Sequence, residues 1–236
     1  GSGIDDLKNE ILTRATEISH DSKTLIPRIH VDRAFSPTGV GTVITGTLTG
    51  ATLHKGDQLT CLPQNLTATI RNAQNHNQSL PTVQPGTRTA LNIPDLPLNQ
   101  KGKPGVQRGS LLTTPNHITP TSTLDITLTR QKRSITGQTA TKRPLKNTET
   151  VILHHGTSRT RARVILHDTT TLLPGQTTFA QLRLETPIPA CTGDKFVIRD
   201  GSQQGTLGGG TILDANATPK QFRTPERAEF LTALAE

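Results

Sequence analysis

The chain has 236 residues, of which 31% are hydrophobic and 2% aromatic, and it contains no Trp, Tyr or Met. This length accommodates two domains of ordinary size, whose cores have to be built from Val, Ile, Leu and Ala. A formal net charge of +8 favours a polyanionic partner, with nucleic acid ahead of a membrane surface. Two cysteines, far apart and outside any CxxC spacing, exclude a disulfide framework and a cysteine zinc site.

No segment has the composition of a signal peptide, and no apolar run is long enough to cross a bilayer. We therefore expect a cytoplasmic protein without a membrane partner.

Residues 4–18 carry apolar side chains at helical spacing, with Asp5 and Asp6 in the first turn, where the helix dipole favours acids. The segment predicts an amphipathic helix. Since the pattern that follows is strand-like and offers no helix to pack on, we expect residues 1–23 to be the C-terminal helix of a preceding domain.

From Leu25 the hydrophobic pattern changes to a period of two, which is typical of half-buried strands. Turn sequences such as "SPTG", "HKGD" and "QPGT" separate the apolar runs. The pattern predicts a closed antiparallel barrel over residues 24–116, with "LNQKGKPGVQRG" as an exposed loop. The predicted strands are Arg28–Phe35, Gly41–Leu48, Gln58–Leu62, Thr67–Gln74, Thr87–Ile93 and Ser110–Thr114.

A second all-β pattern predicts another barrel over residues 117–215. Its "GTLGGGTILD" segment has three consecutive glycines, which suit either a barrel corner or bulge, or the close approach of a ligand. Both explanations stay open. The predicted strands are Ser122–Arg130, Glu149–His154, Arg159–His167, Thr177–Leu184, Lys195–Asp200 and Gly210–Asp214.

Residues 216–236 read as a polar linker followed by a helix, with Thr224 as N-cap, Pro225 at the first helical position, and Leu231 and Leu234 on an apolar face. We expect the start of a further domain here. The predicted fold class is all-β: two antiparallel β-barrels with a short helix at each end.

Motifs of common catalytic and cofactor sites are absent from the sequence. There is no GxxxxGK[ST] phosphate loop and no GxSxG elbow. His154 and His155 are adjacent in a predicted strand and face opposite sides, and the other histidines lack metal-ligand spacing. We therefore expect no enzyme active site, no cofactor and no metal in these residues.

Basic residues are spread along the chain, in runs such as "RQKR" ending at Arg133, "KRPLK" starting at Lys142, and "SRTRAR" ending at Arg163. Such a distribution suits a long phosphate backbone better than a compact ligand. The alternative is a soluble basic domain without a polyanionic partner, since net charge speaks to association and not to fold.

Two stretches resemble one protein family in the order of their motifs. The first contains "VDRAF", "GTVITGTL", a "GD" turn and "PGTRTALN", and it resembles the second domain of translational GTPases in the form found in selenocysteine-specific elongation factors. The second, "GDKFVIRDGSQQGTLGGGTILD", is similar to the third domain of the same family. Together they cover roughly Leu25 to Asp214.

The resemblance implies what lies beyond these two domains. The first helix would close a GTPase domain that binds GTP and Mg²⁺, so the parent protein would be a GTPase. The last helix would begin a winged-helix region, which in bacterial members binds the selenocysteine-insertion hairpin of the mRNA. The implied partners of the whole protein are selenocysteinyl-tRNA, the ribosome and that hairpin.

The resemblance also implies an aminoacyl-tRNA site in the first barrel. Asp32, Arg33 and Arg88 match the positions that surround the selenocysteinyl group. A selenol is more acidic than a thiol, so two guanidiniums would favour its anion over a neutral serine, while a carboxylate accepts from the aminoacyl amino group. The alternative for Asp32 and Arg33 is a weak ion pair at a strand edge, with the two side chains on opposite faces.

The same resemblance adds Gly39 and Gly41 of the "SPTGVG" loop and His76 of the "HNQ" segment to the expected tRNA contacts. Three departures from the family pattern stand out: Thr38 and Gly205 occupy positions where basic residues are common, and His30 replaces a common Pro. The first two put individual tRNA contacts in doubt, and no consequence is evident for the third.

The leading hypothesis is therefore an RNA-binding pair of barrels that carries selenocysteinyl-tRNA. One alternative is the equivalent part of another translational GTPase, which would carry a different aminoacyl-tRNA. A second alternative, from another class, is a structural or protein-interaction barrel pair with no RNA role.

Overall fold

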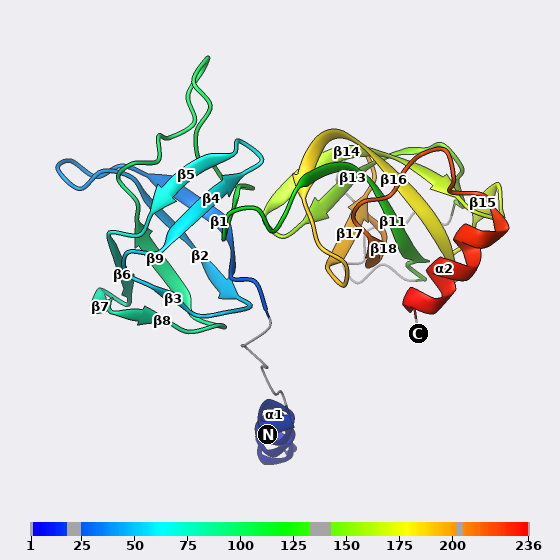
Figure 1. Cartoon of the computed structure of the whole chain (residues 1–236). Coiled ribbons are helices and arrows are strands. Elements are labelled where there is room, and N and C mark those ends of the chain that lie inside the picture. Colours follow the sequence, from blue (N-terminus) through cyan, green and yellow to red (C-terminus); the bar gives the residue numbers. More distant parts are fainter. Residues whose placement is uncertain (1, 18–24, 133–142, 202–204, 236) are drawn as a thin grey trace.

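The computed structural model describes residues 2–17, 25–132, 143–201 and 205–235, and it confirms the predicted fold class. Two antiparallel β-domains lie side by side, with α2 packed on the second (Figure 1). Arg133 and Lys142, named in the predicted basic runs, lie outside the described residues. The elements are α1 (Ile4–Glu17), β1 (Arg28–Phe35), β2 (Val43–Thr49), β3 (Leu53–His54), β4 (Gln58–Leu62), β5 (Leu66–Thr69), β6 (Asn72–Asn75), β7 (Gln78–Leu80), β8 (Thr82–Val83), β9 (Arg88–Asn92), β10 (Leu111–Thr113), β11 (Pro120–Arg130), β12 (Leu145–Lys146), β13 (Thr150–His155), β14 (Ser158–Leu166), β15 (Thr171–Leu172), β16 (Thr177–Pro189), β17 (Lys195–Arg199), β18 (Thr206–Asp214) and α2 (Pro225–Ala235).

The first domain is an eight-stranded sheet in the order β5-β4-β10-β1-β2-β9-β6-β7, with β3 and β8 as a separate pair. The chain itself joins the two sides of this sheet, because β5 pairs with β4 while β6, the next strand, pairs with β9. At the bend between them, the amide of Ile70 donates to Asp57 and the amide of Arg71 donates to Asn92. The sheet is thereby curled around a core that includes Ile29, Val31, Ile44, Leu59 and Leu91.

The second domain is a closed barrel of six strands in the order β11-β16-β14-β13-β17-β18, completed by pairing of β18 with β11. As the composition requires, aliphatic side chains make up most of its interior, with Phe196 as the aromatic member. Representative core residues are Leu124, Ile126, Leu153, Leu182 and Ile198.

Most predicted strands coincide with observed ones to within a few residues, but two predictions were wrong. Residues 24–116 were predicted as a closed barrel, whereas the described strands form a curled sheet in which β5 and β7 do not pair with each other. Thr67–Gln74 forms two strands, β5 and β6, since its middle turns from one side of the sheet to the other. The two-residue strands β3, β8, β12 and β15 and the short β7 were not predicted, because such segments are too short to show a period of two. The predicted exposed loop protrudes from the first domain, with Lys101, Gly102 and Lys103 exposed at its end (Figure 1).

The three glycines of β18 are explained by strand packing. A Cβ atom on Gly210 would lie 1.8 Å from the carbonyl oxygen of Thr127 in β11, and one on Gly209 would lie 2.5 Å from the carbonyl oxygen of Phe196 in β17. The backbones of the flanking strands therefore leave no room for a side chain. This observation favours the structural explanation of the run over the ligand explanation.

A cluster of four charged or titratable side chains joins the two domains. Arg28 donates from Nη1 to Oδ1 of Asp194 at 2.7 Å, and Nε2 of His155 lies 2.9 Å from Oδ2 of the same carboxylate. The ring of His30 packs edge-on against the ring of His155, with centroids 5.4 Å apart. Nearby, the hydroxyl of Thr157 donates to the carbonyl of Val31 at 2.7 Å. We call Arg28, His30, His155 and Asp194 the junction cluster.

The junction cluster shifts the pKa values of three of its members. Burial alone would lower the pKa of Arg28, but the hydrogen bond and charge of Asp194 raise it. Burial alone would raise the pKa of Asp194, but the hydrogen bonds from His155 and Arg28 hold it well below its usual range. Burial, aided by His155 and Arg28, lowers the pKa of His30 to about 4. The departure of His30 from the family pattern thus has a structural role, which is to fill the contact between the domains as a neutral ring.

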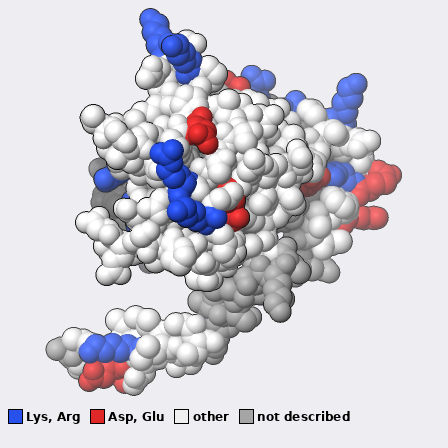
Figure 2. All heavy atoms as spheres, turned by 60° about the vertical axis from the view of Figure 1, so that its left-hand side comes forward, with Lys and Arg blue, Asp and Glu red and all other residues white. Residues whose placement is uncertain are grey.

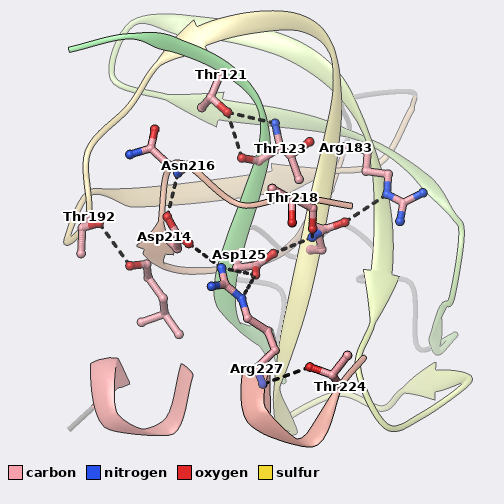
Figure 3. Close-up of polar contacts among 12 residues, drawn as sticks. Thr121, Thr123, Asp125, Arg183, Thr192, Asp214, Asn216, Thr218, Thr224 and Arg227 are labelled. Atoms are coloured by element: carbon pink, nitrogen blue, oxygen red, sulfur yellow. Dashed lines mark hydrogen bonds and ion pairs between the residues drawn. The ribbon is translucent and has the colours of Figure 1, made fainter. Parts of the chain in front are cut away.

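Helix α2 is fixed to the second barrel by one arginine. Arg227 donates from Nε to Asp125 at 2.8 Å and from Nη2 to Asp214 at 2.5 Å (Figure 3). Asp125 is fully buried, and burial raises its pKa although Gln181 and Arg227 bond to it. The predicted N-cap is confirmed, because the hydroxyl of Thr224 accepts from the Arg227 amide at 3.2 Å.

Only part of the predicted apolar face of α2 is covered in the described structure, with Leu231 fully buried and Leu234 40% exposed. In α1, which forms as predicted, Ile4, Leu7 and Leu12 are all more than half exposed. No helix in the described part of the chain is long and apolar enough to cross a membrane.

We predict that Gly210→Ala lowers the free energy of unfolding by about 1–3 kcal/mol, because the methyl group would force β18 away from β11. The matched control is Gly201→Ala, since a Cβ atom there meets nothing within 4 Å. Denaturant unfolding followed by circular dichroism measures both. Equal stability of the two variants would contradict the packing explanation.

A second prediction concerns pH. The folded state holds His30 neutral down to about pH 4, whereas the unfolded chain binds a proton near pH 6.5, so the stability that His30 contributes is complete above pH 6.5 and is lost as the pH falls towards 4. The expected slope from this residue is at most about 1.4 kcal/mol per pH unit. In urea titrations between pH 7.5 and 4.5, His30→Gln should flatten the decline, and the exposed control His117→Gln should not. Parallel curves for the unsubstituted chain and His30→Gln would rule this out.

Candidate functional site

A β-bulge places Asp32 and Arg33 on the same face of the first domain. Val31 pairs with Gly46 and Arg33 pairs with Thr45, so Asp32 is an extra residue without a partner on β2. Val31 is buried before the bulge and Ala34 packs against the core after it. Asp32 and Arg33 therefore both point outward. The alternative that placed these neighbours on opposite faces assumed a regular strand, which the bulge interrupts.

The structure brings Asp32 and Arg88 together. Arg88, at the start of β9, reaches across β2 and donates from Nη1 to Oδ2 of Asp32 at 2.5 Å. The other carboxylate oxygen, Oδ1, accepts a short hydrogen bond from the hydroxyl of Thr45 on β2. The Arg88 side chain is 60% exposed and that of Asp32 22%, so solvent screens the pair and it contributes little to stability. Such an exposed, well-formed pair is better explained by recognition than by folding.

A recess of about 220 Å³ adjoins this pair and also includes His76. His76 and Asn77 form the turn between β6 and β7, both with positive φ (47° and 63°). Asn75, next to the turn, donates from its side chain to the backbone carbonyl of Arg88 at 2.8 Å. We call the group of Asp32, Thr45, Asn75, His76 and Arg88 the Asp32–Arg88 site.

Gly39 and Gly41 lie in the loop between β1 and β2, both with positive φ, which favours glycine there. The side-chain amide of Asn92 holds this loop by donating to the carbonyls of Val40 and Thr42. A recess of about 120 Å³ beside it shares Gln74 and Ala90 with the recess next to Arg88. The predicted loop therefore borders the same face as the Asp32–Arg88 site.

Arg33 is not brought together with Arg88. It lines a different recess of about 470 Å³, together with Phe35, Arg108 and the base of the protruding loop. Among the described residues it makes no ion pair. The expected convergence of two guanidiniums on one cavity is therefore not present in this structure, although both residues belong to the outer face of the same sheet.

Three arginines on one strand form the densest basic feature of the second barrel. Arg159, Arg161 and Arg163 alternate with buried residues along β14, so all three are exposed, roughly 6.7 Å apart in succession. Arg183 on β16 lies directly opposite Arg163, and like charges in such a pair repel each other. Glu185 is the acidic side chain of the recess among these residues. We call the four arginines the arginine row.

The face of the molecule in Figure 2 lacks such a concentration of positive charge. Its Lys and Arg side chains are scattered, and uncharged side chains cover most of it. Because the arginine row costs repulsion in the absence of an anion, a polyanionic ligand gives it a physical explanation.

A metal site has no support within the described residues, where no group of three His, Cys, Asp or Glu side chains is placed to hold an ion. The arrangement of the Asp32–Arg88 site supplies donors and one carboxylate, which suits the binding of a small polar or anionic group. Sequence reasoning missed Thr45 and Asn75 in this site. Pairing the "VDRAF" and "GTVITG" segments across their turn would have placed Thr45 beside Asp32.

Comparison with known proteins gives consistent matches. The family model described as the β-barrel domain of selenocysteine-specific elongation factor matches residues 132–219. The selenocysteine-specific elongation factor of Desulfomicrobium baculatum is 29% identical over 214 residues, which are 91% of this chain and 32% of that protein. That of Escherichia coli K12 is 29% identical over 235 residues, 100% of this chain and 34% of that protein.

A solved structure is also similar over the whole chain. The crystal structure of the bacterial selenocysteine-specific elongation factor EF-Sec matches with a TM-score of 0.73 and 27% identity, covering 100% of this chain and 36% of that one. The fold and these matches define a curled β-sheet domain and a closed β-barrel of the translation elongation factor type. The chain is similar to selenocysteine-specific elongation factors and spans about a third of the length of the relatives it matches.

Proposed function

We propose that these residues form the aminoacyl-tRNA-binding part of a factor that delivers selenocysteinyl-tRNA to the ribosome. The observation that carries the proposal is the exposed Asp32–Arg88 pair beside a small recess on the first domain. Selenocysteine is an anion at neutral pH, and a guanidinium donates strong charge-assisted hydrogen bonds to an anion. The Asp32 carboxylate is suited to accept from the amino group of the aminoacyl ester.

Arg88 takes the first role in this proposal, because its guanidinium is already held at the site. Arg33 is the second guanidinium of the Asp32, Arg33 and Arg88 set. It now faces another recess, and its exposed side chain would have to change rotamer when the ligand binds. Gly39, Gly41 and His76 border the same face and would contact the end of the tRNA.

The second barrel would hold the tRNA through its phosphates. Three exposed members of the arginine row, Arg159, Arg161 and Arg163, follow β14 at a regular spacing, which suits successive phosphates of an RNA backbone. Recognition there would depend on charge and shape and not on base sequence.

The remaining partners belong to parts of the protein beyond these 236 residues. The relatives are about three times as long as this chain. We place GTP and Mg²⁺ binding, and the contact with the mRNA insertion hairpin, in those other parts, and we place the whole protein in the cytoplasm, where translation occurs.

Removal of the Arg88 charge tests the amino-acid-recognition role. Arg88→Gln should weaken binding of selenocysteinyl-tRNA about ten- to a hundredfold, the worth of a charged hydrogen bond, and change binding of the same tRNA carrying serine much less. Equilibrium dissociation constants at fixed salt measure this, with Arg71→Gln as an exposed control on the first domain. An equal loss for both aminoacyl groups would refute charge selection.

Salt dependence tests the RNA-binding role itself. The logarithm of the binding constant should fall linearly with the logarithm of the salt concentration, and Arg161→Gln and Arg163→Gln should each reduce that slope by about one. Lys8→Gln, which removes an exposed charge from α1, should leave the slope unchanged. Absence of salt-dependent tRNA binding by the unsubstituted chain would favour the alternative of a barrel pair without an RNA role.

A further inference from the structure

We propose that Thr45 is a specificity-determining residue of the Asp32–Arg88 site, which acts by positioning the Asp32 carboxylate so that the site prefers an anionic aminoacyl group to a neutral one. This inference rests on the proposed function. Thr45 itself lines the recess beside Arg88, and the inference concerns its action through Asp32.

The position of Thr45 in the sheet makes this role possible. Thr45 lies on β2, the strand between β1 and β9, opposite Arg33 on one side and Ala90 on the other. Its side chain faces outward, as does that of Asp32 in the bulge. Because the bulge leaves Asp32 without a partner on β2, its carboxylate lies over that strand, and the Thr45 hydroxyl donates to Oδ1.

Each carboxylate oxygen of Asp32 is therefore bound to a different partner. Oδ1 accepts from Thr45, and Oδ2 accepts from Nη1 of Arg88 at 2.5 Å. Two hydrogen bonds to different oxygens fix both torsions of a short side chain, whereas one leaves the carboxylate able to turn about it. The Thr45 hydroxyl thus decides which way the second oxygen faces.

Arg88 is held both at its backbone and at its guanidinium. At its base, the side-chain amide of Asn75 donates to the Arg88 carbonyl at 2.8 Å. At its tip, the guanidinium is 60% exposed and is held by Asp32. A long exposed side chain without such a partner populates many rotamers, and ordering it on binding costs free energy. Thr45 therefore preorganises the donors of Arg88 through Asp32.

The sign of the effect follows from charge. While the Asp32 carboxylate is turned towards Thr45 and Arg88, the remaining guanidinium donors face the recess and favour an anion. If Thr45 no longer holds it, the carboxylate can turn into the recess, where it repels a selenolate and accepts a hydrogen bond from a serine hydroxyl. Loss of the Thr45 hydroxyl should therefore reduce the preference for selenocysteine and not merely weaken all binding.

The same strand offers a matched control. Thr47 also points outward from β2, two residues further on, and lies opposite His30 and Arg88. In the described part of the chain its hydroxyl makes no hydrogen bond. Thr→Val is nearly isosteric and suits a strand at both positions, but only Thr45 bonds to Asp32 and lines the recess. Thr45→Ser keeps the hydroxyl at the recess and therefore isolates the hydrogen bond.

The experiment measures dissociation constants of Thr45→Val, Thr45→Ser and Thr47→Val for one tRNA carrying either selenocysteine or serine. For Thr45→Val we expect the ratio of the two constants to shift at least tenfold towards serine. Thr45→Ser, which keeps the hydroxyl, and Thr47→Val should keep the ratio of the unsubstituted chain. The salt dependence of tRNA binding should be the same in all three variants, because none of them alters the arginine row.

An unchanged ratio in a folded Thr45→Val chain would overturn the inference. If circular dichroism shows that this variant does not fold, Asp32→Asn replaces it: the amide keeps the shape but loses the charge that orients Arg88, and an unchanged ratio there would equally overturn the inference. The proposed function fails in a different way, through absence of salt-dependent tRNA binding, or of any preference for selenocysteine, in the unsubstituted chain. Because the inference rests on the proposed function, that result would also overturn the inference.

Discussion

The contact between Arg28 and Asp194 fixes how the two domains are placed relative to each other, and any ligand that spans both domains depends on that placement. Arg28 begins β1, and Asp194 lies in the turn before β17 of the other domain, 166 residues further along the chain. The same strand supplies His30 and the carbonyl of Val31 to the junction. Directly after these residues the bulge begins, and β1 turns to the outer face with Asp32 and Arg33. One strand thus holds the second barrel with its first half and carries the proposed recognition residues on its second half.

Two ion pairs of similar geometry have different physical roles because their burial differs. In the junction cluster the Arg28 and Asp194 side chains are 24% and 12% exposed, and His155 satisfies the second carboxylate oxygen. Removing one partner would leave a poorly solvated charge, so this pair enforces a relative placement of the domains. In the Asp32–Arg88 pair, the guanidinium faces water and the recess. Its donors remain accessible, which a structural ion pair does not require.

The sequence predicted the local features well and the long-range ones poorly, for physical reasons. The alternation in Arg28–Phe35 predicted β1 to the residue, and the motif order predicted the similarity to selenocysteine-specific elongation factors that the comparisons found. A bulge, however, adds one residue to a segment that still has the composition of a strand. The sequence therefore did not predict that Asp32 and Arg33 share a face. The partners of Arg28 and His30 come from the other domain, and no local pattern relates positions so far apart. The bend after β5 was missed because both of its arms are good strand sequences.

The bulge also changes which alterations in chain length the first barrel can absorb. Without Asp32, Val31 would still face inward, Arg33 outward and Ala34 inward, so the core side chains of β1 would keep their places. Deletion of Val31 or Ala34, in contrast, would disturb the inward positions around it. The acidic residue that orients Arg88 is therefore a one-residue insertion that the scaffold does not need for its own packing. A lineage of such domains could gain or lose it in a single step, and with it the selectivity proposed for this site.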